Sequence, residues 1–91
     1  MAYFAPKPND WGMRLGGYEN FEELVAIGAA IRTRRRNQGI SQEQLAYMAG
    51  IDRSHMGKIE RGERNVSVLN LIRICTALEA RASELLASAD C

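Results

Sequence analysis

The sequence predicts an all-α domain of five short helices, preceded by an irregular N-terminal extension. From residue 20 onward, apolar residues recur at helical spacing, and no segment shows the alternation typical of a strand. Serine, aspartate and asparagine precede several of these segments, where they can cap a helix. Glycines follow several of them, where a helix ends most easily. We therefore expect an arm over residues 1–19 and a single domain over residues 20–91.

The first expected helix runs from Asn20 to Asn37 and ends at Gly39. Asn20 is a candidate N-cap because Glu23 follows three residues later. The apolar stripe of this helix consists of Phe21, Leu24, Ile27 and Ile31. Gly28 interrupts the pattern at a cost of about 1 kcal/mol relative to alanine, so it indicates either a break or a close helix contact.

The next stretch, residues 41–60, predicts two short helices joined by a tight turn. Ser41 and Gln44 have the spacing of a capping box, so a helix should begin at the next residue after the serine. Gly50 can adopt the left-handed conformation that ends this helix, and Asp52 can cap the second one. The inward positions are Leu45, Ala46, Ala49, Met56 and Ile59. This is the pattern of a helix-turn-helix, with its core at residues 41–61.

The second helix of this pair is expected to present polar residues outward: Arg53, Ser54, His55, Gly57 and Lys58. Hydrogen-bond donors on the outer face of a short helix are what reading the DNA major groove requires. The alternative is an ordinary solvated surface.

Two further helices complete the domain. Ser67 is expected to cap the first of them, and the second spans Ala82 to about Ser88. The core-facing stripe predicted for the first is Val68, Leu71, Ile72, Cys75 and Leu78.

The net charge of +1 is unevenly distributed along the chain. Residues 26–65 carry eight basic and four acidic side chains, whereas the remainder carries four basic and seven acidic ones. Such polarisation is typical of a one-sided contact with nucleic acid. The consecutive arginines at 34–36 point in different directions on a helix, so one should face the protein body. Arg35 is our candidate.

Other functional classes lack support in the sequence. No apolar run is long enough to span a membrane, and the N-terminus lacks the pattern of a signal peptide. Two cysteines and one histidine provide no disulfide framework and no metal-ligand cluster. No catalytic constellation or phosphate-binding loop is present. We therefore expect a cytoplasmic protein that is not an enzyme and needs no metal, cofactor or small-molecule ligand.

The arm over residues 1–19 contains both prolines and no helical periodicity, which favours an irregular segment. It nevertheless carries Tyr3, Phe4, Trp11, Met13 and Leu15. The alternative is that it folds back on the domain or on a partner subunit. A minor-groove arm is disfavoured because only Lys7 and Arg14 could supply positive charge.

The segment SQEQLAYMAGIDRSHMGKIERGERNVSVLNLIRICTAL resembles the Cro/repressor class of helix-turn-helix domains, also called Xre-like. Its IERGERNVS portion is similar to the controller proteins of restriction–modification operons. The resemblance extends from about Ile27 to Leu86. It implies a five-helix DNA-binding domain that binds palindromic or pseudopalindromic operators as a homodimer.

The resemblance also implies roles for individual residues. Positions that reach base edges in the family match Arg53, Ser54, His55 and Lys58. Phosphate contacts are expected at Gln42, Gly57, Arg64 and Asn65. Arg35 and Glu60 match a pair that joins the first helix to the second helix of the motif. This chain departs from the family at Glu79, where glycine is usual, and in its first 25 residues, which have no counterpart.

The leading hypothesis is a sequence-specific, dimeric DNA-binding transcriptional regulator that acts on double-stranded operator DNA. The controller resemblance implies autoregulation of a restriction–modification operon. The alternative is an antitoxin or other interaction module that neutralises a partner protein, motivated by the arm.

Overall fold

The computed structural model describes residues 21–91, which form five helices and no strand. They are α2 (Glu22–Asn37), α3 (Gln42–Ala49), α4 (Arg53–Glu60), α5 (Val68–Ala77) and α6 (Ala82–Ser88). The predicted all-α, helix-turn-helix fold is thus confirmed. Within this part of the chain, every helix is too short or too polar to cross a membrane.

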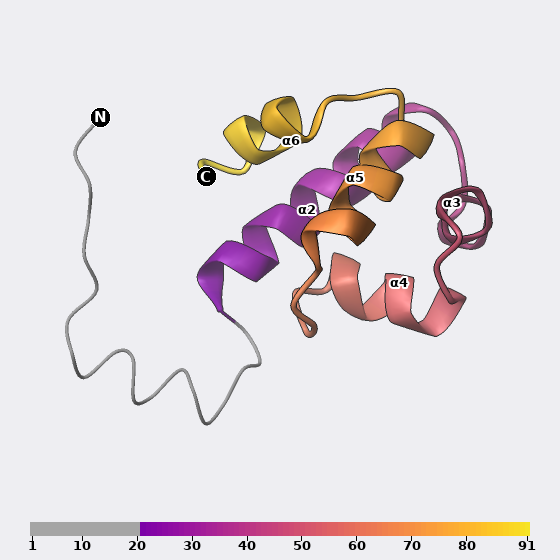
Figure 1. Cartoon of the computed structure of the whole chain (residues 1–91), viewed down its shortest axis with the longest axis horizontal. Helices are drawn as coiled ribbons and strands as arrows, with labels where there is room; N and C mark the ends of the chain where they lie inside the picture. The colour runs from indigo at the N-terminus through magenta and orange to yellow at the C-terminus, as the bar shows by residue number, and fades with distance from the viewer. Residues whose placement is uncertain (1–20) are drawn as a thin grey trace, which may run out of the picture.

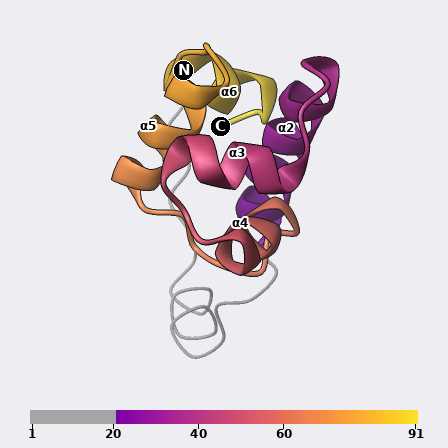
Figure 2. The same cartoon turned by 90° about the vertical axis from the view of Figure 1, so that its right-hand side faces the viewer.

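The helices pack around one core. Helix α3 contacts α4 and α5, while α2 contacts α4 and α6, and α5 also contacts α6 (Figure 1). Figure 2 shows α3 crossing between α2 and α5, with α4 beneath it. The fully buried apolar side chains come from all five helices or their ends and include Ile31, Leu45, Met56, Ile59, Ile74, Leu78 and Leu85. Helix α4 is therefore held on its inner side by α2 and α3.

The ends of α3 and α4 follow the predicted capping pattern. Ser41 and Gln44 form a reciprocal capping box, in which the Gln44 amide donates to Ser41 Oγ at 3.0 Å and the Ser41 amide donates to Gln44 Oε1 at 2.7 Å. Gly50 then takes the left-handed conformation with φ 70°. Asp52 caps α4 by accepting a hydrogen bond from the Ser54 amide. Local sequence therefore determines this turn.

The start of α2 differs from the prediction by one residue. Phe21, rather than Asn20, holds the N-cap position, and its side chain cannot cap the helix through a hydrogen bond. Asn20 and the arm at residues 1–19 lie outside the described residues.

The buried face of α5 also differs from the predicted stripe. Val68 and Ile72 are exposed, whereas Ile74 is fully buried. The observed inward positions are Leu71, Ile74, Cys75 and, just after the helix, Leu78. The two stripes share three residues and differ by a rotation about the helix axis, because α5 is apolar over more than half of its circumference and only packing selects the inner side.

Gly28 marks a close helix contact rather than a break. It is buried within the continuous helix α2. A Cβ atom at this position would lie 2.5 Å from the carbonyl oxygens of both Ile59 and Glu60. The absence of a side chain thus lets α2 approach the end of α4, where Glu60 is located.

Candidate DNA-binding interface

The N-terminal end of α4 presents the outward polar residues. Arg53 and Ser54 are exposed, while His55 and Lys58 are partly buried. The Asp52 carboxylate accepts hydrogen bonds from the Ser54 hydroxyl and the Ser54 amide. The hydrogen bond from the Ser54 hydroxyl is the largest of the effects that lower the pKa of Asp52. The cap therefore stays ionised at neutral pH, and Ser54 keeps acceptor capacity on its oxygen.

Gly57 does not belong to this outward face, so the expectation that it points outward is wrong. It is buried, and a Cβ atom there would lie 3.2 Å from both Gln42 Oε1 and Arg61 Nη1. The side chains of these two residues extend over the glycine. The sequence suggested the outward position because glycine has no side chain by which its direction could be judged.

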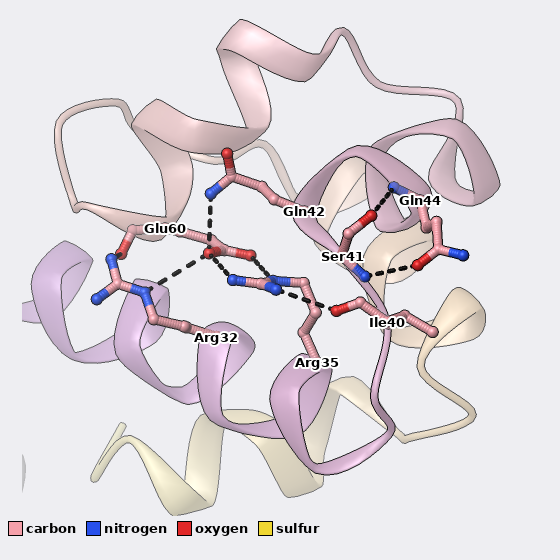
Figure 3. A network of polar contacts seen from close by, with 7 residues as sticks. All are labelled: Arg32, Arg35, Ile40, Ser41, Gln42, Gln44 and Glu60. Atoms are coloured by element: carbon pink, nitrogen blue, oxygen red, sulfur yellow. Dashed lines mark hydrogen bonds and ion pairs between the residues drawn. The ribbon is translucent and has the colours of Figure 1, made fainter.

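Glu60, the last residue of α4, lies at the centre of a polar cluster (Figure 3). Arg35 makes a bidentate ion pair with it, with Nε 2.8 Å from Oε2 and Nη2 3.1 Å from Oε1. The same guanidinium donates from Nη1 to the Ile40 carbonyl at 3.0 Å. Arg35 is thus the inward member of the arginine run, and it joins α2 to both α4 and the start of α3.

Two further residues contact Glu60. Gln42 Nε2 donates to Glu60 Oε1 at 3.0 Å. Arg32 Nη2 donates to the Glu60 carbonyl at 3.3 Å, and Arg32 Nε lies 3.6 Å from the carboxylate. The sequence did not lead us to predict Arg32 as a partner of Glu60, although its position three residues before Arg35 places it on the same face of α2.

The cluster keeps Glu60 ionised although its side chain is completely buried. Burial raises the pKa of Glu60, but hydrogen bonds from Arg35 and Gln42 and the charges of Arg35 and Arg32 outweigh it, so the pKa is lowered overall. Across residues 21–91 every buried polar side-chain atom has a hydrogen-bond partner. The carboxylate therefore serves as a fixed structural anchor.

The loop after α4 holds the remaining candidate residues. Arg64 and Asn65 are exposed. Arg61 pairs with Glu63, with Nε 3.0 Å from Oε2, and this hydrogen bond lowers the pKa of Glu63. The loop leaves Arg64 and Asn65 accessible to a partner. The arrangement as a whole suits the docking of a short, rigidly held helix against a groove.

Comparison with known proteins places this geometry in a family. A helix-turn-helix family model matches residues 31–85. Control protein C.SmaI of Serratia marcescens is 41% identical over 69 residues, covering 76% of this chain and 80% of its own length. Control protein C.BamHI of Bacillus amyloliquefaciens is 40% identical over 63 residues, covering 68% and 78% respectively.

A solved structure agrees with these relatives. The restriction-modification controller protein C.AhdI from Aeromonas hydrophila superposes with a TM-score of 0.70 at 45% identity, covering 71% of this chain and 98% of that one. The chain therefore belongs to the Xre-like helix-turn-helix family of DNA-binding transcriptional regulators.

Proposed function

We propose that this protein is the autoregulatory controller of a restriction–modification operon and binds its operator as a homodimer. The observation that carries the proposal is the geometry of α4, whose polar N-terminal end is exposed while its C-terminal end is anchored through Glu60. The names of the relatives C.SmaI, C.BamHI and C.AhdI support the controller role. No finding favours the antitoxin alternative.

Base contacts are assigned to the exposed side of α4. Arg53 is the principal candidate, because a guanidinium can donate two hydrogen bonds to a guanine. Ser54, His55 and Lys58 follow it along the first two turns, where the N-terminal part of the helix enters the major groove. A well-placed arginine discriminates between bases by about 1–3 kcal/mol.

Phosphate contacts are assigned to residues beside α4. Arg64 and Asn65 are accessible in the following loop. Gln42 occupies the first position of α3, where the helix dipole and unpaired amides favour an anion. One N–H of its side-chain amide is committed to Glu60, and the second is available for a phosphate. Gly57 is left out of this assignment because it is buried.

The homodimer is proposed from operator geometry and from the surface of α5. Two copies related by a two-fold axis would place their α4 helices in successive major grooves, about 34 Å apart. Val68, Leu69 and Ile72 on α5 are 73%, 57% and 47% exposed. Such a cluster of large apolar side chains indicates a surface that a second copy would bury. Because operator DNA is the partner and Cys75 and Cys91 are free thiols, the reducing cytoplasm is the proposed location.

Selection from a random duplex library tests this proposal, followed by footprinting on DNA upstream of the gene. We expect one enriched motif with two-fold symmetry, half-sites one helical turn apart, and a match in the upstream region. Enrichment of no motif would contradict the sequence-specific function. A motif without symmetry would contradict the dimer.

A further inference from the structure

We propose that Gln42 positions the recognition helix α4 by acting through Glu60, and so sets base specificity without itself contacting a base. This inference rests on the proposed DNA-binding function and deepens it. It is motivated by the placement of the Gln42 side chain, which lies against the inner side of α4 (Figure 3).

Both ends of the Gln42 amide lie beside α4, and its nitrogen is held there by a hydrogen bond. Its nitrogen donates to Glu60 Oε1 at 3.0 Å, while its oxygen faces Gly57, where an added Cβ would lie only 3.2 Å away. Rotation of the amide by half a turn would bring its oxygen against the carboxylate oxygen, two acceptors with no proton between them. The orientation of the amide is therefore determined, and Gly57 provides the room that it needs.

The hydrogen bond links two points that are distant along the motif. Gln42 is the first residue of α3 and Glu60 is the last residue of α4. At the opposite end of α4, the backbone itself connects the helix to α3 through the turn at Gly50 and Asp52. Helix α4 is thus held to α3 at both ends, and Arg35 and Arg32 tie its Glu60 end to α2.

Loss of this restraint would let the Glu60 end of α4 swing about the turn at Gly50 and Asp52, and so change the angle at which the helix presents its outward side chains. The seven residue steps from Arg53 to Glu60 correspond to about 10 Å of helix. A tilt of about 5° pivoting at one end displaces the other by about 1 Å over this length. Hydrogen bonds to base edges occupy a distance range of only about 0.5 Å, so a shift of this order near Lys58, two residues before Glu60, weakens a base contact there selectively. Contacts between flexible cationic side chains and phosphates tolerate it better.

Gln42→Met is the appropriate variant, because methionine has a similar length but cannot donate to Glu60. Variants of Arg35 or Glu60 are unsuitable because they leave a buried charge without its partner. Gln44→Met is the matched control. It makes the same substitution two residues away and also removes one hydrogen bond, that of the capping box, but it does not touch Glu60.

The experiment measures dissociation constants for the selected operator duplex and for an unrelated duplex at one salt concentration, together with the thermal midpoint. We expect Gln42→Met to lower the ratio of specific to unrelated affinity by about fivefold or more, comparable to the weaker end of a base contact. Gln44→Met should lower the midpoint and leave the ratio unchanged.

Two results would overturn the inference. Equal loss of affinity on both duplexes would make Gln42 a phosphate contact only. A lowered midpoint with an unchanged ratio would make it a stabilising residue only. If Gln42→Met is unfolded at the assay temperature, Gly57→Ala decides in its place, because the new methyl group would lie 3.2 Å from the Gln42 amide oxygen, so that the amide must shift while its donor is retained. An unchanged ratio in that variant overturns the inference.

The wild-type protein separates this inference from the function on which it rests. If wild type binds both duplexes equally, the proposed sequence-specific function fails. If wild type discriminates between them and Gln42→Met discriminates equally well, only the positioning role fails.

Discussion

Glu60 is the residue on which the arrangement of the motif depends most. Its carboxylate has no exposed surface, yet two arginines and an amide surround it. An ionised group can remain buried only when such partners replace the lost water. The resemblance named Arg35 and Glu60 as a pair, and the two are in contact. Arg32 and Gln42 as further partners emerge only from the packing of α2, α3 and α4.

The stability of the protein should depend on the ionisation of Glu60. Its pKa is lowered by folding, so its contribution is fully present above the unfolded-state value of about 4.3 and is lost as pH falls through the folded-state value. At pH 7 we expect Glu60→Gln to reduce the free energy of unfolding by about 3–5 kcal/mol, as for a broken buried ion pair.

Denaturant unfolding at pH 7 and at pH 3 measures this dependence. The difference between wild type and Glu60→Gln should shrink at the lower pH, because pH 3 lies below the unfolded-state pKa and the unfolded wild-type chain then gains a proton at Glu60. Glu63→Gln, a change at an exposed carboxylate, serves as the control and should have little effect at either pH. A difference that stays constant with pH would show that the ion pair does not stabilise the fold.

Gly28 allows a test of the contact between α2 and α4. Alanine normally stabilises a helix by about 1 kcal/mol relative to glycine. Here we expect Gly28→Ala to destabilise the protein by about 1–3 kcal/mol, because its Cβ would overlap two backbone carbonyl oxygens. Thermal or denaturant unfolding distinguishes the two effects: the helix propensity of alanine would raise the free energy of unfolding, whereas the steric overlap would lower it. A stabilised variant would mean that the two helices are not in close contact.

Among the helices, the residues at which a helix begins were predicted from the sequence more accurately than the face that the helix buries. Capping is a local interaction, so Ser41, Asp52 and Ser67 identified the starts of α3, α4 and α5. The inner face of α5 depends on which neighbours are present, and the prediction that Val68 and Ile72 are buried was wrong. The prediction that Gly57 faces outward was also wrong, because glycine has no side chain that indicates its direction, and Gln42 of α3 and Arg61 at the end of α4 cover it.

The end of α5 contains a non-glycine residue in a backbone conformation that favours glycine. Glu79 has φ 55°, at the position where the resemblance led us to expect a glycine. A left-handed residue with a side chain costs roughly 1–2 kcal/mol. We therefore expect Glu79→Gly to raise the free energy of unfolding by about 1 kcal/mol, measured by chemical denaturation.

The reciprocal change provides the control for this prediction. Gly50 has φ 70° and open space around the position of a Cβ atom, so Gly50→Ala should lose about 1 kcal/mol through backbone strain alone. If Glu79→Gly is neutral while Gly50→Ala is destabilising, the strain assigned to Glu79 is incorrect.

At the scale of the whole molecule, the proposed function combines a polar face at α4 with an apolar surface on α5. Leu69→Glu should place a charge in the proposed dimer surface and shift the protein towards monomer, with little effect on folding because Leu69 is 57% exposed. Sedimentation equilibrium measures the shift. Ser83→Glu on the exposed side of α6 makes the same change in charge and should leave the oligomeric state unchanged.

The most direct test of the central claim, that α4 reads the operator, is the effect of Arg53→Ala on binding at fixed salt. Arg81→Ala removes the same charge from an exposed position at the start of α6 and is the control. We predict that Arg53→Ala weakens operator binding by about 5- to 150-fold and relaxes base preference at one position of each half-site, while Arg81→Ala does neither. Unchanged affinity and base preference in Arg53→Ala would contradict the account.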